Sequence, residues 1–427
     1  MKALDREITR LALPALGSLA VEPLVSLVDT AFVGRLGSDE LAGLGISGAV
    51  FLWSFIIFIF LAYATTTIVA GAVGAGDLEK ARRTAASSFA FAIVVGLAAA
   101  TLLQVIAVPL VAVFGAGGEA ADAALTYVRI RALAAPAVLV ILAGNGVFRG
   151  HQNTKTPLLI ALAFNLVNFV LDPVLIFGFD MGIAGAAWAS VVAQVFGAVA
   201  FGVVARRRHL VRFDRQAMSM RETRELLGAG AGVSIRTVGL LAVFSGATAV
   251  AARISDEAVA AHRVVDQLFL FLALSVDALA VAAQAMIGKR LGVGDIAGAK
   301  AVGRRLFAFG ALAGVAIAVL LLALRTVIPV VFTDEREVLE QIGTIYWFLL
   351  ALQPLNAVIF VGDGVLLGWS AFKFMAVATV AAAVAAGVVL ALVLPLELGL
   401  VGVYAGLTTL MVGRAVALGV WWRRTVS

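Results

Sequence analysis

Residues 11–33 read LALPALGSLAVEPLVSLVDTAFV, which is long enough to cross a bilayer and too apolar for a helix on the surface of a soluble protein. Asp29 lies inside this stretch, and no cation within four residues neutralises it. Because a carboxylate in hydrocarbon costs about 2.5 kcal/mol or more, such a residue marks a functional site by default. The stretch indicates a membrane protein whose first span holds an ionisable site.

The composition of the whole chain agrees with this interpretation. Hydrophobic residues make up 62% of the sequence and charged residues 14%, against about 25% charged residues in soluble domains. The mean hydropathy is +1.06. Apolar runs longer than about 20 residues, without alternating polar positions, exclude a transmembrane barrel. The chain has no cysteine, which excludes disulfides and thiolate metal sites.

At about 20 apolar residues per crossing, the 427 residues accommodate about twelve helices. Glycine and proline mark the joints between them. We expect spans at 8–36, 41–71, 84–114, 121–147, 156–177, 182–205, 223–250, 259–287, 302–332, 338–365, 372–395 and 399–422.

The distribution of positive charge orients these spans. Of the 32 Lys and Arg residues, 23 fall at the two termini and in the even-numbered connections, and six fall in the others. The bias predicts that both termini lie in the cytoplasm and that the protein lies in the cell (inner) membrane. It also accounts for the net charge of +6 without nucleic acid as a partner. The segment 1–10 has no small-residue cleavage site, so we expect it to be the tail of the first span and not a removed signal.

The two halves of the chain resemble each other at a nearly constant offset. Gly74-Ala-Gly-Asp77 recurs as Gly292-Val-Gly-Asp295, and Gly182-Ile-Ala-Gly185 recurs as Gly399-Leu-Val-Gly402. Because each half holds six spans, both begin on the same side of the membrane and the repeats are parallel. We predict an all-α polytopic membrane protein of twelve transmembrane helices, in two parallel-repeat six-helix lobes around a central cavity. The expected lobes are 1–205 and 223–427, joined by a basic cytoplasmic linker at 206–222.

Polar residues in the first half are candidates for an ion-coupling site. Glu22 and Asp29 share one face of the first span, and Asn168 and Asp172 share one face of the fifth. Measured from the outer helix ends, Asp29, Asp172 and Ser190 lie roughly 9–12 Å deep. We expect these three groups to meet in one pocket.

Two neighbouring carboxylates in a low dielectric cannot both be charged cheaply, so we expect one of them to bind a proton near neutral pH. Their oxygens, with Asn168 and Ser190, are alternatively ligands for Na⁺. A third interpretation is a hydrogen bond between helices, which is the better one for Ser190 alone. The equivalents of Asp29 in the second half are Gly246 or Ala247, so packing common to both halves does not require the carboxylate.

The second half has its own intramembrane polar residues. Four side chains of the eighth span are spaced so that they lie on one face of the helix and form a stripe. Arg236 of the seventh span is a candidate partner for them. Opposite charges within one bundle favour a structural or gating role over substrate binding. The stripe consists of Arg263, Asp266, Asp277 and Gln284. Asp363, near the end of its helix between two glycines, is expected to act at that helix end.

The sequence holds no motif for nucleotide hydrolysis and only three scattered histidines. We therefore expect no enzymatic activity, no catalytic residues, no metal site and no cofactor other than a coupling ion, H⁺ or Na⁺. Pro14 and Pro23 interrupt the hydrogen-bond ladder of the first span, which permits a bend.

These residues resemble the multidrug and toxic compound extrusion family over essentially the whole chain. The stretch PLVSLVDTAFVGRLG at 23–37 resembles that family's first helix. The stretch DALAVAAQ at 277–284, with Arg236-Thr237 upstream, resembles its DinF-type branch. The resemblance implies twelve helices in two lobes and export of organic compounds, often cationic, against H⁺ or Na⁺.

In this resemblance Asp29, Asn168 and Asp172 match the family's coupling residues, Ser190 matches a hydroxyl position and Pro14 matches a bend in the first helix. The glutamate that other branches have in the seventh helix has no equivalent here apart from Glu225 at the helix start. The resemblance therefore does not extend cation coupling to the second lobe.

The sequence thus predicts an ion-coupled antiporter that exports amphipathic organic compounds by alternating access. An alternative is an exporter of a specific organic anion or metabolite, which requires Arg236 and Arg263 to face the cavity. A second alternative is a lipid-headgroup flippase, which requires a cavity open to lipid and lined by more cations. The expected partners are small organic substrates and the lipid bilayer, and we expect a monomer.

Overall fold

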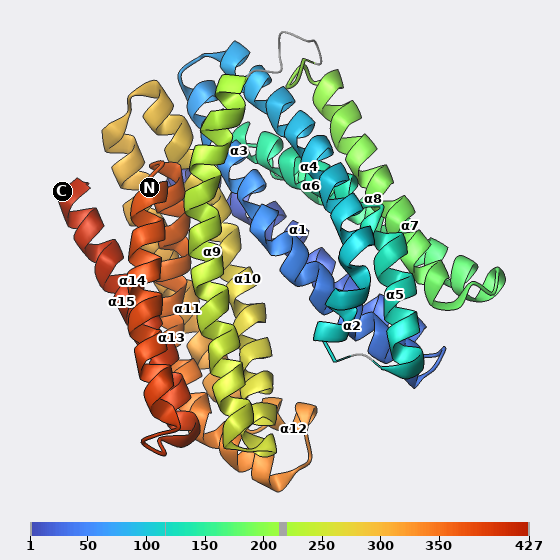
Figure 1. Ribbon diagram of the computed structural model, residues 1–427. Helices are drawn as coiled ribbons and strands as arrows, with labels where there is room; N and C mark the ends of the chain where they lie inside the picture. Colours follow the sequence, from blue (N-terminus) through green and yellow to red (C-terminus); the bar gives the residue numbers. More distant parts are fainter. Residues whose placement is uncertain (1, 116, 213–219, 426–427) are drawn as a thin grey trace. The chain divides into compact units, whose positions relative to one another are not determined.

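The chain folds almost entirely into helices, as Figure 1 shows for the computed structural model. The structure describes residues 2–115, 117–212 and 220–425, apart from the side chains of Lys2 and Glu22. The α-helices are α1 (Lys2–Val33), α2 (Ser38–Phe55), α3 (Phe60–Gly74), α4 (Leu78–Val113), α5 (Gly118–Ala132), α6 (Ala135–Gly150), α7 (Lys155–Pro173), α8 (Gly182–Arg207), α9 (Met220–Ile254), α10 (Asp256–Val293), α11 (Ile296–Ala323), α12 (Ile328–Phe332), α13 (Arg336–Gly368), α14 (Phe372–Val393) and α15 (Gly399–Thr425). A 3₁₀ turn, η1 (Ile56–Ile59), joins α2 to α3, and a π-helical turn, η2 (Val174–Gly178), follows α7.

Within the described residues, eleven helices are long and apolar enough to cross a membrane, and the number reaches twelve if α5 and α6 form one span. Those two helices are bent by 55° relative to each other. The expected span at 121–147 therefore corresponds to this bent pair and not to one continuous helix. Pro136 lies in the first turn of α6, where a helix can lack an N–H without losing a hydrogen bond. The expected span at 302–332 likewise divides into α11 and the short α12.

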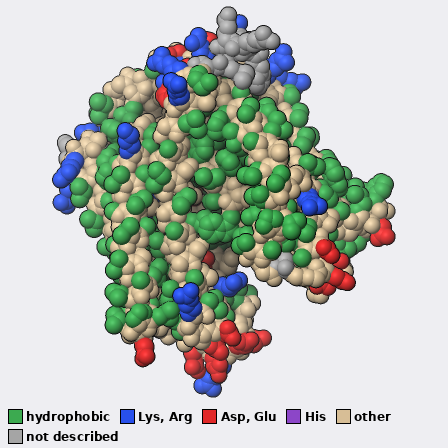
Figure 2. Space-filling view, viewed as in Figure 1, with side chains coloured by type: hydrophobic (Ala, Val, Ile, Leu, Met, Phe, Trp, Pro, Cys, Tyr) green, Lys and Arg blue, Asp and Glu red, His purple; other side chains and the backbone are tan. Residues whose placement is uncertain are grey.

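Large apolar side chains cover the outside of the helices. On the face drawn in Figure 2, hydrophobic side chains spread over the helix flanks and charged side chains gather near the helix ends. Val105 is 75% exposed and Leu312 is 67% exposed. Apolar surface of this extent is stable against lipid chains and not in water. The protein is an integral membrane protein.

The chain divides into two compact units. The N-terminal unit comprises Arg10–Gly230 with Gly292–Gly294, and the C-terminal unit comprises Met1–Thr9, Ala231–Leu291 and Asp295–Ser427. The first turns of α1 belong to the C-terminal unit, where Asp5 accepts two hydrogen bonds from Arg305 at 2.6 and 2.8 Å. Part of the expected linker, residues 213–219, lies outside the described residues.

The backbone turns of the two units repeat at the offset found in the sequence. Asp77 caps α4 by accepting from Lys80 N at 2.8 Å, and Asp295 caps α11 by accepting from Gly298 N at 2.8 Å. At two of these turns the equivalent residues differ, so there the backbone is better preserved than the sequence. Four pairs of residues with positive φ recur: Gly76 and Gly294, Gln152 and Ser370, Asp180 and Glu397, and Gly182 and Gly399.

Close contacts between helices also recur in the two units. Gly96 of α4 lies against Pro136 of α6, and a Cβ atom at Gly96 would lie 2.7 Å from the Pro136 nitrogen. Gly314 of α11 lies against Pro354 of α13, and a Cβ atom there would lie 2.7 Å from the Pro354 Cα atom. Only glycine permits these approaches, because backbone atoms cannot move aside as a flexible side chain can. The two units therefore share one packing frame.

Candidate functional site

Two carboxyl groups face each other in the N-terminal unit. Asp29 lies in the last two turns of α1, and Asp172 is the penultimate residue of α7. Their side chains lie within hydrogen-bonding reach of each other, with Asp172 fully buried and Asp29 half-buried. A carboxylate has no proton to donate, so a stable contact of this kind requires a proton or a cation between the two groups.

The end of α7 fixes the position of Asp172. Asn168, one turn earlier, donates from Nδ2 to the Asp172 Oδ1 atom at 3.4 Å. Pro173 follows directly, and the chain then widens into the π-helical turn η2. Gly185 of α8 packs against η2 so closely that a Cβ atom would lie 2.8 Å from the Ile176 nitrogen. Wide turns of this type occur often at functional sites, and here the turn is held by the next helix.

Arg131 of α5 supplies a cation to the two carboxyl groups. Its charge acts on both Asp29 and Asp172. Its Nη1 atom donates to the Tyr127 hydroxyl at 2.8 Å and to the Ser190 Oγ atom at 3.2 Å. The guanidinium also lies 5.4 Å from the centre of the Phe51 ring. Asp29 has no cation near it in the sequence, so its positive partner comes from a distant helix.

One oxygen of each carboxyl group is still available to a ligand. The Oδ1 atom of Asp29 and the Oδ2 atom of Asp172 are buried without a hydrogen-bond partner. A buried polar atom left unpaired costs about 1–3 kcal/mol. A proton or a desolvated monovalent cation would remove this cost, while Arg131 favours the charged form of the pair. The site can therefore alternate between a loaded and an unloaded state.

The structure brings together four of the residues that the sequence proposes for ion coupling: Asp29, Asn168, Asp172 and Ser190. Ser190 joins the cluster through Arg131. Glu22 lies in α1, but its side chain is outside the described residues. Pro14 lies within α1, which continues as one helix past it, and the bend at Pro14 stays a prediction.

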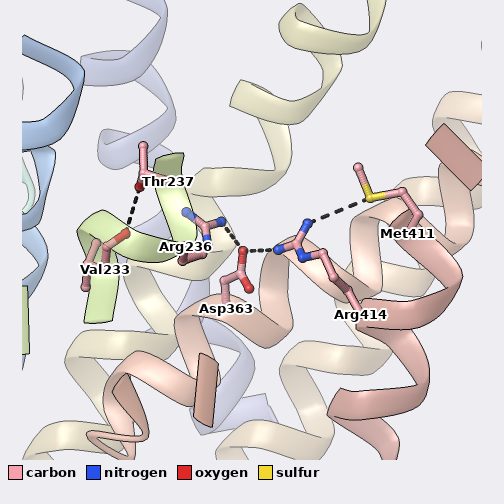
Figure 3. Close-up of polar contacts among 6 residues, drawn as sticks. All are labelled: Val233, Arg236, Thr237, Asp363, Met411 and Arg414. Atoms are coloured by element: carbon pink, nitrogen blue, oxygen red, sulfur yellow. Dashed lines mark hydrogen bonds and ion pairs between the residues drawn. The ribbon is translucent and has the colours of Figure 1, made fainter. Parts of the chain in front are cut away.

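The C-terminal unit contains a different ionic cluster, drawn in Figure 3. Asp363 of α13 accepts from Arg236 of α9 and, at 2.6 Å, from Arg414 of α15. Arg414 is 4% exposed, and its Nη1 atom lies 3.7 Å from the Met411 sulfur. The expectation that Asp363 acts at its helix end is wrong. It lies inside α13, which ends at Gly368, and joins three helices.

The four residues of the polar stripe of α10 lie in different environments. Arg263 is exposed, whereas Gln284 is buried. Asp277 acts electrostatically on Arg414, so its charge belongs with the cluster around Asp363. Asp266 lines a cavity formed by four helices. Alignment on one helical face does not bring these residues into one site, because the helix is long and meets different neighbours along its length.

Sequence reasoning gave no role to Arg131 or Arg414. Arg131 falls inside the expected span 121–147. Arg414 falls inside the expected span 399–422. An arginine within a span is costly and requires a partner, so position alone singles out both residues. Their partners are not evident from the sequence, since they lie on other helices.

Comparison with known proteins gives the same division into halves. The sequence matches the MatE family over residues 14–174 and again over residues 237–393. The Arabidopsis thaliana protein DETOXIFICATION 44, chloroplastic, is 34% identical over 97% of this chain and 81% of its own. DNA damage-inducible protein F of Escherichia coli (strain K12) is 27% identical over 98% of this chain and 92% of its own.

A solved structure shares the fold over nearly the whole chain. This crystal structure of MATE in the bent conformation matches with a TM-score of 0.90 at 21% identity, and the match covers 99% of this chain and 95% of that chain. At such an identity the likeness concerns the fold.

Proposed function

Because the chain belongs to the MatE family of multidrug and toxic compound extrusion transporters, we propose that it is a secondary active antiporter that exports amphipathic organic compounds in exchange for H⁺ or Na⁺. Members of this family are transporters and not enzymes, and they use ion gradients without a cofactor. Alternating access is the mechanism by which two parallel repeats transport a substrate.

The observation that carries the proposal is the pair Asp29 and Asp172, with Arg131 beside it. Binding of one H⁺ or Na⁺ removes the repulsion between the two carboxyl groups and weakens their attraction to Arg131. Loss of that ion restores both effects. The contacts among α1, α5 and α7 therefore differ between the two states, and a ligand shifts a conformational equilibrium only through such a difference.

The two alternative transport functions receive less support. Export of an organic anion requires Arg236 and Arg263 to face the cavity, but Arg236 is engaged with Asp363. A lipid-headgroup flippase requires a cavity lined by several cations. The described residues that line the cavity at Asp266 include no Lys or Arg. An organic cation fits this balance of charge better.

We propose that the protein functions as a monomer, with small organic molecules and lipid as its partners and without nucleic acid. The excess of Lys and Arg at alternate connections favours cytoplasmic termini in the cell membrane.

The direct test is transport by purified protein in proteoliposomes, with H⁺ and Na⁺ gradients imposed separately. We expect Asp29→Asn to lower ion-driven efflux of an organic cation by about 100-fold or more, because an amide cannot bind and release the coupling ion. Asp39→Asn is the matched control, since Asp39 is exposed in the first turn of α2. Normal efflux by Asp29→Asn under both gradients would reject the coupling role.

A further inference from the structure

Two helices of this protein each belong to both compact units. Residues 2–9 of α1 are part of the C-terminal unit, whereas the rest of α1 is part of the N-terminal unit. Residues 220–230 of α9 are part of the N-terminal unit, and the rest of α9 is part of the C-terminal unit. Because Asp29 of α1 corresponds to Gly246 or Ala247 of α9, these are the first helices of the two repeats. Each repeat thus begins in the unit that the other repeat forms.

Ion pairs hold the beginning of α1 to α10 and α11. Arg305 of α11 donates to both carboxylate oxygens of Asp5, at 2.6 and 2.8 Å, and this two-point geometry fixes the orientation of the pair. Arg290, in the last turn of α10, donates to the Glu7 Oε2 atom at 3.3 Å. The other end of the Arg290 guanidinium donates to the Asp295 Oδ2 atom at 3.3 Å.

The beginning of α9 is held to α4 in a similar way. Lys80, in the first turn of α4, donates from Nζ to the Glu225 Oε1 atom at 3.0 Å. The residue after this carboxylate, Leu226, is 1% exposed, and the residue after Glu7, Ile8, is also 1% exposed. In both helices a buried apolar side chain therefore accompanies the carboxylate that forms the ion pair.

The two carboxylates occupy equivalent positions in the repeated frame. At the offset that pairs Gly74 with Gly292, Glu7 corresponds to Glu225. Unlike Asp29 and Asp363, these acidic residues are present in both repeats. The duplication therefore does not separate this feature from the fold, as it does for the buried charges, but shows it twice.

Both carboxylates meet a cation beside a Gly-x-Gly-Asp turn. The Lys80 backbone N–H donates to Asp77, which ends one of these turns, and the Arg290 side chain donates to Asp295, which ends the other. The two cations do not correspond to each other at the same offset. Each unit therefore supplies the positive charge from a different position of an equivalent turn.

The exposure of these ion pairs allows them to break and form again. The side chains of Glu7 and Glu225 are 33% and 40% exposed, and that of Asp5 is 28% exposed. An ion pair with this much exposure changes an equilibrium by about fivefold at most. Several pairs that break together have a larger effect, because their contributions multiply. The buried link at Asp363 is different, since its loss leaves charges without water.

From these observations we propose that the ion pairs at the beginnings of α1 and α9 form a paired latch that sets the equilibrium between the two states of alternating access. One half of the latch consists of Asp5 and Glu7 with Arg305 and Arg290, and the other half consists of Glu225 with Lys80. The latch stabilises the state in which both halves are closed, and both open in the other state. Because α1 also carries Asp29, ion binding and latch opening act on one helix. The role of the latch in transport rests on the antiport function proposed above.

The test is the distance between two spin labels, measured by electron paramagnetic resonance on the purified full-length protein in lipid nanodiscs. The sequence has no cysteine, so Leu78→Cys and Ile296→Cys supply the only labelling sites. Both positions are exposed, they are equivalent in the repeats, and one lies in each unit. We expect the combined variant Asp5→Asn, Glu7→Gln, Glu225→Gln to change the ratio of the distance populations by about tenfold or more. Unchanged populations in this variant would overturn the proposal.

Glu340→Gln is the matched control, because it removes an exposed ion pair with Arg336 that is not part of the latch. Its distance populations should equal those of the labelled wild-type protein. Exchange of the charges separates the ion pair from other effects at the helix start. Asp5→Arg alone and Arg305→Asp alone should each shift the populations, and the two together should restore them. A double variant that stays as shifted as the single ones would contradict the latch.

The spin-label measurement requires no transport, so the two proposals can fail separately. Normal efflux by Asp29→Asn would reject the coupling role and leave the populations as the test of the latch. Unchanged populations in the combined variant, with efflux lost in Asp29→Asn, would reject the latch alone.

Discussion

The two units of this protein share a backbone frame and differ in the charges that they enclose. In the N-terminal unit, Arg131 accompanies two carboxyl groups, whereas in the C-terminal unit Arg236 and Arg414 share the single carboxylate of Asp363. None of these charges has a charged counterpart in the other unit: Asp29 corresponds to Gly246 or Ala247, Arg131 to Leu349, Asp363 to Asn145 and Arg414 to Phe196 or Gly197.

The comparison separates the groups that helix packing requires from those that it does not require. Helix contacts such as Gly96 on Pro136 and Gly314 on Pro354 are present twice, so they belong to the fold. The ionic clusters are present once each, at positions that the other unit fills with apolar or neutral residues. Two carboxyl groups that share one arginine can exchange a proton or a cation. A carboxylate held between two arginines is satisfied already and acts as a fixed link between helices.

The largest effect should come from removing the fixed link. The N-terminal unit has Asn145 at the position equivalent to Asp363, so Asp363→Asn introduces the same residue in the C-terminal unit. The substitution leaves Arg236 and Arg414 without their shared carboxylate. Loss of one partner of a buried ion pair costs about 3–5 kcal/mol. Thermal or denaturant unfolding in detergent measures this loss, with Asp256→Asn as the exposed control. Wild-type stability in Asp363→Asn would show that the arginines do not depend on Asp363.

The shared frame predicts similar losses in both units from one type of substitution. Gly96→Ala and Gly314→Ala each force a methyl group against the backbone of a neighbouring helix. Overpacking of this kind costs about 1–3 kcal/mol. Unfolding measurements on the two variants should give losses of similar size. A loss in one variant only would mean that the two helix contacts are not equivalent.

A smaller effect, on transport, is expected from making the N-terminal unit resemble the C-terminal unit at one position. Arg131→Leu introduces the residue found at position 349 and removes the cation that favours the charged carboxyl pair. We expect efflux in proteoliposomes to fall by about tenfold, because ion release becomes harder. Arg129→Leu, on the same helix, is the control. Efflux that is unchanged in Arg131→Leu would remove Arg131 from the site.

The smallest effect concerns a turn that occurs in both units. His151 follows α6 and Trp369 follows α13, and each backbone N–H bonds the carbonyl group four residues earlier. Burial lowers the pKa of His151, whose Nδ1 atom donates to the Val147 carbonyl at 2.9 Å.

Because the pKa of His151 is lower in the folded state, the unfolded state binds more protons once the pH falls below about 6.5. The His151 contribution to stability is therefore fully present above that pH and is lost as the pH falls toward the lowered pKa. We expect a loss of about 1 kcal/mol or less between pH 7 and pH 5. Melting temperatures of the wild-type protein and of His151→Gln across this range measure it. Identical pH profiles would contradict the prediction.

Much of the fold could be predicted from the sequence. The apolar runs determine the membrane spans, and the constant offset between matching motifs identifies the duplication, which the paired turns and glycine contacts repeat in three dimensions. The break between α5 and α6 was missed, because the apolar character continues through Leu133 and Ala134 although the helix axis does not.

The candidate sites, too, could be predicted from the sequence only in part. The meeting of Asp29 with Asp172 follows from depth, since a helix rises about 1.5 Å per residue and the distance from each helix end can be counted. Arg131 also falls inside an expected span, but no count along the chain reveals which side chains its guanidinium reaches. The same holds for Arg236 and Arg414, which meet at Asp363 across three helices.

Hydropathy, repeated motifs and charge positions in the sequence are thus sufficient to predict that this protein spans a membrane many times, that it is built from two repeats, and that one repeat has carboxyl groups inside its spans. Hydropathy and helical rise are properties of a single segment, so they can be evaluated without knowledge of the neighbouring segments. The pairing of the charges, and the position of Asp266 and Asn356 in the wall of one aromatic cavity, follow from the folded structure and not from the sequence. Those contacts depend on how helices rotate and cross, which is set by packing between segments far apart in the chain.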